Sequence, residues 1–258
     1  MVAARVIALI SKKGGVGKTT SAVNLAAAFA ERGRRTLVVD LDPQASASLS
    51  LGLRRGDLIP SAADLLLRRK RLGEVVRATS VPGLDLVTAS IDLASLESEL
   101  GFQSSEEMRL AGLLRGPQLS GYDLVFIDCP PSFTLLSRNA ITAADGFVVP
   151  VVPHFLAVEG LRGLLDSVDR LRHRCRSGGP LLGILPTMVD FRTRLSQETL
   201  DELRQEFGDK VFAVTIRTNV RIAEAPSQGL PVLQYDPDAT GSGAYRLAAD
   251  ELELRLTR

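Results

Sequence analysis

The chain has 258 residues, 45% of them hydrophobic, and its 31 basic residues nearly balance its 30 acidic ones. A net charge of +1 gives no overall attraction for nucleic acid, so any such binding requires a local patch. The first apolar run is too short for a secretory leader, and no run approaches the roughly 18 apolar residues of a membrane span. We expect a cytoplasmic protein with one domain over residues 1–258.

The cysteines and histidines give no sign of a metal centre. Cys129 and Cys175 lie far apart in the sequence and lack the spacing of zinc ligands, and His154 and His173 are isolated from both. We therefore expect no zinc or iron–sulfur site.

The first predicted elements are a strand, a glycine-rich loop and a helix. The apolar run RVIALI at 5–10 has the pattern of a buried parallel strand and leads into SKKGGVGKTT at 11–20. The next residues predict a helix that ends at Gly33. Its apolar face would hold Val23, Ala26, Ala27 and Ala30. This order of elements is typical of a phosphate-binding loop.

The glycines of this loop let backbone N–H groups turn inward, and the helix N-terminus beyond adds a partial positive charge, so a polyphosphate is the expected ligand. Lys18 is predicted to hold the β- and γ-phosphates. The loop departs from the usual pattern because Lys12 stands where the first glycine belongs, and Lys13 follows it. The predicted nucleotide-binding residues are Gly14, Gly15, Val16, Gly17, Lys18, Thr19 and Thr20.

Further apolar strands alternate with helical segments along the chain. They are predicted in RTLVVDLDPQ (35–44), YDLVFIDCPPS (122–132), GFVVPVV (146–152) and PLLGILPTMVD (180–190). Strands that are apolar on both faces favour a mainly parallel central sheet covered by helices on both faces. We therefore predict a three-layer α/β fold of the P-loop NTPase type, with the ligand at the carboxyl ends of the strands.

Two aspartates follow predicted strands at that edge. Asp128 directly follows the apolar run LVFI. A carboxylate at the end of such a strand is typical of one that serves Mg²⁺ beside the phosphates, and Thr19 would then bind the ion directly. Asp128 could also cap the turn that follows it. Asp42 either forms an Asx turn before Pro43 or orients the water that attacks the γ-phosphate, and spacing alone leaves both open.

Several of these segments together carry a family resemblance. They are KKGGVGKTTSAVNLAAAFAERGRRTLVVDLDPQ, YDLVFIDCPPS, LLGILPTMVDFRT and NVRIAEAPSQGLPV. From residue 5 to about residue 250 the chain resembles the ParA group of partition ATPases. This group lies within the larger class with a deviant phosphate loop that also includes MinD.

The resemblance implies roles for individual residues. Lys13 would be the signature lysine that reaches across an ATP-sandwich homodimer to the partner subunit's ATP. Asp42 would support hydrolysis and, with Thr19 and Asp128, serve the magnesium ion. Met188 would lie among the nucleotide-binding residues. A cation supplied in trans acts like an arginine finger, so ATP binding and dimerisation become linked. Lys12 is expected to be a solvent-facing substitution.

The chain also departs from the family pattern. Where many chromosomal members read DPQGNAT, it reads DPQASAS at 42–48, and the lost glycine predicts a stiffer switch loop. The usual PRNVR appears as RTNVR at 217–221, which affects adenine contacts. The segment PVVPHFLAVEGL at 150–161 replaces the commoner form with paired tyrosines, near the family's dimer and partner surfaces.

The resemblance implies binding to double-stranded DNA without sequence preference. The candidate residues form two pairs on separate loops, which the family would place on one face of the dimer: Arg192, Arg194, Arg217 and Arg221. Each alone is typical of a solvated surface arginine, whereas together they could contact phosphates. No helix-turn-helix segment precedes the phosphate loop, so operator binding is not expected.

The resulting hypothesis is an Mg²⁺-dependent ATPase that dimerises on ATP, coats the nucleoid and segregates a chromosome or plasmid. It would be weak alone and stimulated by a ParB-like or other adaptor with a basic N-terminal segment. The alternatives are a MinD-like membrane switch, a ParA-like positioner of a protein organelle, and a reductase or amide ligase on the same scaffold. Against the membrane switch, residues 244–258 are predicted to form a covering helix with Leu247, Leu252 and Leu256 in the core.

Overall fold

The computed structural model describes residues 4–100, 106–114 and 117–257. In these ranges the strands form one seven-stranded sheet in the order β3-β4-β2-β5-β1-β6-β7. Only β3 runs antiparallel to its neighbour; the other pairs described are parallel. The strands are β1 (Arg5–Leu9), β2 (Thr36–Asp40), β3 (Val76–Ala78), β4 (Leu84–Val87), β5 (Leu124–Asp128), β6 (Gly146–Val151) and β7 (Leu181–Pro186).

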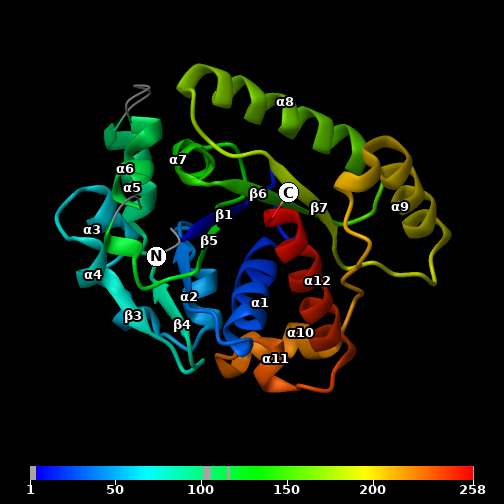
Figure 1. Ribbon diagram of the computed structural model, residues 1–258, viewed down its shortest axis with the longest axis horizontal. Helices are drawn as coiled ribbons and strands as arrows, with labels where there is room; N and C mark the ends of the chain where they lie inside the picture. Colours follow the sequence, from blue (N-terminus) through cyan, green and yellow to red (C-terminus); the bar gives the residue numbers. More distant parts are fainter. Residues whose placement is uncertain (1–3, 101–105, 115–116, 258) are drawn as a thin grey trace.

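The helices connect these strands and cover both faces of the sheet, as Figure 1 shows. Those before β5 are α1 (Lys18–Glu31), α2 (Ser46–Ser50), α3 (Ala62–Leu66), α4 (Leu72–Val75), α5 (Asp92–Leu100) and α6 (Arg109–Leu113). Those after it are α7 (Leu135–Ala143), α8 (Ala157–Cys175), α9 (Arg194–Phe207), α10 (Val220–Glu224), α11 (Val232–Tyr235) and α12 (Thr240–Leu256). None of the helices in the described ranges is long and apolar enough to cross a bilayer.

Side chains of the strands point alternately to the two faces of the sheet and so form two hydrophobic cores. In β1, Val6 and Ala8 pack on the side of α7 and α8, whereas Ile7 and Leu9 pack on the side of α1 and α12. Successive side chains of a strand point to opposite faces, so a strand that is apolar throughout feeds both cores at once. The predicted three-layer α/β fold is confirmed, and so are its four later strands in shortened form.

One prediction about the last helix is wrong. Leu252 is buried and Leu256 is partly buried, but Leu247 is 57% exposed. Five residues turn a helix by about 500°, which places Leu247 roughly 140° away from Leu252. The inward face is instead completed by Tyr245 and Ala249, which pack on the side of α1.

Candidate functional site

The parallel sheet brings three loops to one edge. β1 ends at Leu9 and leads into the glycine-rich loop, β2 ends at Asp40, and β5 ends at Asp128. In the sheet register Asp128 lies beside both Leu9 and Asp40. The sequence motifs that were expected to converge therefore meet at the carboxyl ends of neighbouring strands.

The glycine-rich loop has a backbone that only glycine adopts easily. Gly15 has φ +70°, and Gly17, the N-cap of α1, has φ +81°, both in the left-handed region. Thr187, at the end of β7, donates its hydroxyl to the carbonyl of Val16 at 2.8 Å. Lys18 is buried, and its ammonium folds back to donate to the carbonyl of Lys13 at 3.1 Å. The loop is thus closed around an inward-facing lysine at a helix N-terminus, which suits a polyphosphate.

Thr19 and Asp128 are in direct contact at this edge. The Thr19 hydroxyl donates to Oδ2 of Asp128 at 2.7 Å, while the buried Oδ1 has no hydrogen-bond partner among the described residues. Burial raises the pKa of Asp128 well above its usual range, and the neighbouring charge of Asp40 adds to this. A buried carboxylate oxygen without a partner is costly unless a cation or water completes it. Thr19 and Asp128 therefore fit a magnesium ion.

The donor set also fits the way magnesium binds. In the part of the chain that the structure describes, no three His, Cys, Asp or Glu side chains form a cluster that could hold a metal on their own. Mg²⁺ is usually held by one or two protein oxygens, with waters and substrate phosphates completing the octahedron. A hydroxyl and one carboxylate beside a phosphate loop match that arrangement.

Asp42 forms the Asx turn that was one of the two roles expected for it. Its Oδ1 accepts a hydrogen bond from the backbone N–H of Gln44 at 2.9 Å, which is an Asx turn. Its own N–H donates to Oδ1 of Asp40 at 3.1 Å. This turn does not prevent its other oxygen from orienting a water.

Asp40 is a site residue that the sequence reasoning missed. It is fully buried, and its Oδ2 accepts from both the N–H and the hydroxyl of Ser48. Burial raises the pKa of Asp40 to about 6, against the lowering effect of the hydrogen bonds from Ser48. It holds the loop after β2 in shape. Asp40 could have been found from the sequence, because it is a carboxylate at the end of an apolar strand, the same pattern that identified Asp128.

One residue of the loop after β2 has a left-handed backbone. Ala45 is buried and has φ +56°, and its N–H donates to the carbonyl of Asp42 at 2.8 Å. A residue with a Cβ tolerates this conformation poorly. The contacts of Ser48 with Asp40 hold the loop in this shape.

The two lysines at the mouth of the phosphate loop both contact the α8 region. Lys13 is exposed, and its ammonium lies 3.4 Å from Nε2 of His154. Lys12 is also exposed, but its ammonium donates to the carbonyl of Gly163 at 2.6 Å and to the hydroxyl of Ser167 at 3.0 Å. Lys12 is therefore fixed to α8 rather than simply solvated, a contact between segments far apart in the sequence.

Comparison with known proteins places this geometry in a family. The family model described as an AAA domain matches residues 4–178. The chromosome-partitioning ATPase Soj of Thermus thermophilus is 44% identical over 252 residues, covering 98% of this chain and 96% of the relative. The sporulation initiation inhibitor protein Soj of Bacillus subtilis is 41% identical over 248 residues, covering 96% and 98%. The chain belongs to the Soj/ParA family of partition ATPases.

A solved structure with the same fold carries a different name. It is described as cobyrinic acid a,c-diamide synthase from Mycobacterium smegmatis with bound ATP analog and magnesium. It is 33% identical, has a TM-score of 0.84, and covers 98% of this chain and 96% of its own. Nucleotide and magnesium thus bind to a protein of this fold, in agreement with the Thr19–Asp128 geometry.

Of the arginines that the ParA resemblance assigned to DNA, Arg192 and Arg217 lie on loops, whereas Arg194 begins α9 and Arg221 lies within α10. Backbone bridging between Val189 and Arg217 joins the loop after β7 to the segment before α10. The Arg217 guanidinium stacks on the ring of Phe191, 4.6 Å from its centroid. Met188, assigned to the nucleotide, follows Thr187 with φ +50° and is half-exposed.

Three of the four arginines have acidic partners on their own chain. Arg192 forms a two-pronged pair with Asp190, and Arg194 pairs with Glu198. Arg221 pairs with Glu224 at 2.9 Å and with Asp236 at 3.1 Å. The four arginines are exposed, but the structure balances the charge of three of them within the chain.

Proposed function

We propose that this ParA-family chain is, as one domain over residues 1–258, a Mg²⁺-dependent ATPase that forms an ATP-sandwich homodimer. The dimer binds double-stranded DNA without sequence preference and segregates a chromosome or plasmid. The observation that carries the proposal is the contact of Thr19 with Asp128 beside the inward-facing Lys18. The second oxygen of Asp128 has no partner among the residues that the structure describes. The name of the 44% identical relative, a chromosome-partitioning ATPase, supports the choice of cargo.

Hydrolysis would use residues from three strand ends. When bound, magnesium would neutralise charge on the β- and γ-phosphates. The glycine-loop N–H groups and Lys18 hold the phosphates in place, and Thr19 and Asp128 hold the ion. Asp42, whose Oδ1 is committed to the turn, would orient the attacking water with its other oxygen.

Lys13 would act across the dimer. It lies outside the phosphate cradle, is exposed, and its ammonium contacts only His154 among the described side chains. Leaving a histidine ring costs less than leaving a carboxylate. A lysine that reaches the partner subunit's γ-phosphate neutralises charge only in the assembled dimer, which links ATP binding to dimerisation.

Binding to DNA would require the arginines to exchange partners. Arg192, Arg194 and Arg221 would leave exposed carboxylates for backbone phosphates, and exposed ion pairs are weak. One subunit would therefore gain little, whereas the doubled surface of the dimer would gain more. This accounts for DNA binding that depends on ATP and for association with the nucleoid.

The remaining parts of the proposal concern partners and cargo. Hydrolysis would be weak alone and stimulated by a ParB-like or other adaptor with a basic N-terminal segment. α12 packs on the α1 side through Tyr245 and Leu252, so it serves as a covering helix rather than a membrane tail. The structure named as a diamide synthase is 33% identical to this chain, whereas the Soj relatives are 41% and 44% identical. We therefore favour partition over amide synthesis.

The proposed ATPase is tested by steady-state phosphate release with Mg²⁺ and with excess chelator. We expect turnover only with the metal, and its loss in Thr19→Ala at unchanged melting temperature. Metal-independent turnover, or full activity of Thr19→Ala, would refute the assignment of the magnesium site. A matched control is Thr20→Ser, which keeps a hydroxyl next to the same loop.

A further inference from the structure

A cavity lies between α7 and α8. These two helices are on the side of the sheet opposite α1 and α12 (Figure 1). It has a volume of about 250 Å³. Its walls are Phe133, Arg138, Ser167, Arg170, Leu171 and Arg174. We call it the α7–α8 pocket. Three of its six wall residues carry a permanent positive charge, which is unusual for a cavity with no assigned ligand.

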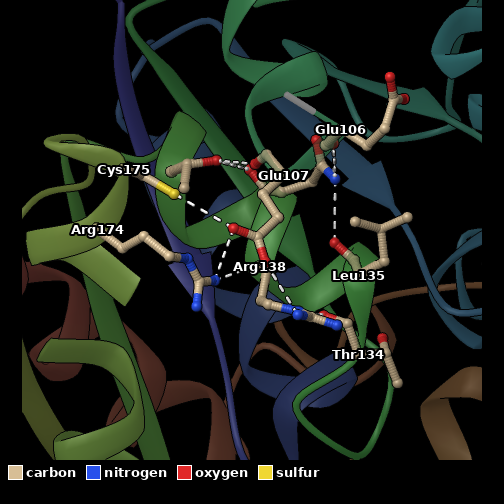
Figure 2. A network of polar contacts seen from close by, with 9 residues as sticks. Glu106, Glu107, Thr134, Leu135, Arg138, Arg174 and Cys175 are labelled. Carbon is tan, nitrogen blue, oxygen red and sulfur yellow. Dashed lines mark hydrogen bonds and ion pairs between the residues drawn. The ribbon is translucent and has the colours of Figure 1, made fainter. Parts of the chain in front are cut away.

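A buried carboxylate fixes two of these arginines. Figure 2 shows Glu107 between Arg138 and Arg174, with Cys175 beside it. Nη1 of Arg138 donates to Oε1 at 2.9 Å, and Nη2 of Arg174 donates to both oxygens at 2.6 and 2.7 Å. Burial alone would raise the pKa of Glu107, but the hydrogen bond and charge of Arg174, with Arg138 and Cys175, lower it. The carboxylate is therefore ionised and holds both guanidinium groups in place.

These bonds leave donors available toward the pocket. Arg174 uses only Nη2 for Glu107, and its Nε and Nη1 have no acceptor in the part of the chain that the structure describes. Arg170 has no acidic partner among the described residues, and its Nη2 donates to the Ser167 hydroxyl at 3.3 Å. That hydroxyl also accepts from Lys12 of the phosphate loop. Three guanidinium groups and one carboxylate leave a net charge of +2, to which Lys12 adds.

The shape of the pocket decides what kind of anion it fits. A carboxylate side chain needs a small polar recess with apolar walls for its methylene stem, and Phe133 and Leu171 supply such walls. A DNA backbone instead presents a long row of phosphates. A recess of this kind favours a flexible carboxylate side chain over the rigid row of phosphates of a DNA duplex.

We propose that the α7–α8 pocket receives an aspartate or glutamate side chain from an acidic segment of a partner protein. Arg170 and Arg174 would bind it by charge-assisted hydrogen bonds, with Arg138 held behind them by Glu107. This partner segment is opposite in charge to the basic adaptor segment expected at the ATPase, so it defines a second interaction surface. The proposal stands whether or not the chain hydrolyses ATP.

The test uses a fluorescein-labelled hexaglutamate peptide and fluorescence anisotropy with the full chain at low salt. The key variant is Arg170→Gln, because Arg170 does not contact Glu107 and its loss leaves that network intact. We expect the peptide to bind the native chain and to bind Arg170→Gln about tenfold more weakly, as one charge-assisted contact is lost. The matched control is Arg176→Gln, which removes the same charge at the exposed end of α8, outside the pocket, and should change affinity less than about twofold.

Five results would overturn the proposal. They are no binding of hexaglutamate to the native chain, equal binding by Arg170→Gln, and equal loss of binding in both variants, which would indicate attraction to net charge alone. The fourth is displacement of the peptide by inorganic phosphate at the peptide's own concentration, which would make this a small-anion site. If Arg170→Gln instead weakens binding of a DNA duplex, the pocket belongs to nucleic acid and the acidic-peptide proposal is wrong.

Discussion

Neutralising Glu107 should destabilise the native state substantially. The substitution Glu107→Gln keeps the side-chain size but places an amide among the donors of Arg138 and Arg174 (Figure 2). A hydrogen bond to a charged group contributes about 1.5–3 kcal/mol. Arg138 is 19% exposed, so its bond counts in full, whereas Arg174 is 51% exposed and its bond counts as a surface pair of about 0–1 kcal/mol. We expect a total loss of roughly 2–4 kcal/mol.

The assay is thermal unfolding followed by circular dichroism, with Glu206→Gln as the matched control. Glu206 pairs with Arg162 on the surface, and both side chains are exposed. For a chain of this size each kcal/mol shifts the Tm by about 2–4 °C. Glu107→Gln should lower the Tm by roughly 4–16 °C and the control by no more than about 4 °C. Equal shifts in the two variants would refute the claim that the Glu107 network is structurally important.

The difference in stability between the native chain and Glu107→Gln should depend on pH in a definite direction. Because the native contacts lower the pKa of Glu107, their contribution is fully present above its unfolded value of about 4.3 and is lost as the pH falls through the native value. The stability difference between the native chain and Glu107→Gln should therefore be constant from neutral pH down to about pH 5 and shrink below it. A difference that stays constant to about pH 3 would contradict an ionised, paired Glu107.

Three further predictions concern the ATPase itself. Lys18→Ala should abolish ATP binding, whereas Lys13→Ala should bind ATP and fail to dimerise in sedimentation velocity; a Lys13→Ala protein that dimerises normally defeats the trans-lysine role. Asp42→Ala should bind ATP but turn it over about 100-fold more slowly or worse, since one water-orienting group is lost. Unchanged turnover would show that Asp42 serves only to form its Asx turn. Arg192→Glu with Arg221→Glu should remove DNA binding but leave the ATP dimer intact, and a double variant that binds as tightly as the native chain would disprove that assignment.

Much of the fold and of the phosphate site could be predicted from the sequence because both depend on local patterns. Strands that are apolar throughout identified β1, β2, β5, β6 and β7, and the glycines identified the loop. β3 has only three residues and β4 only four, too short to show a pattern. Thr19 and Asp128 were expected together because parallel strands place their carboxyl ends at one edge.

What could not be predicted depends on contacts between distant segments. The bond of Lys12 to Ser167 and the pairing of Glu107 with Arg174 join residues that no sequence spacing relates. Leu247 was misplaced because an amphipathic pattern does not fix the rotation of a helix to within one residue. The acidic partners of the surface arginines were missed because composition shows charges without showing their pairing.

The central claim is that ATP creates the DNA-binding species. It is tested most directly by fluorescence anisotropy of the native chain on two duplexes of unrelated sequence, with Mg²⁺ and either ATP or ADP. We predict equal affinity for the two duplexes and binding only with ATP. Four arginines per dimer, at positions 192 and 221, should give a log–log salt slope of about −3.6 or steeper, at about −0.9 per phosphate contact. Equal binding with ADP, or a strong preference for one duplex, would contradict the account.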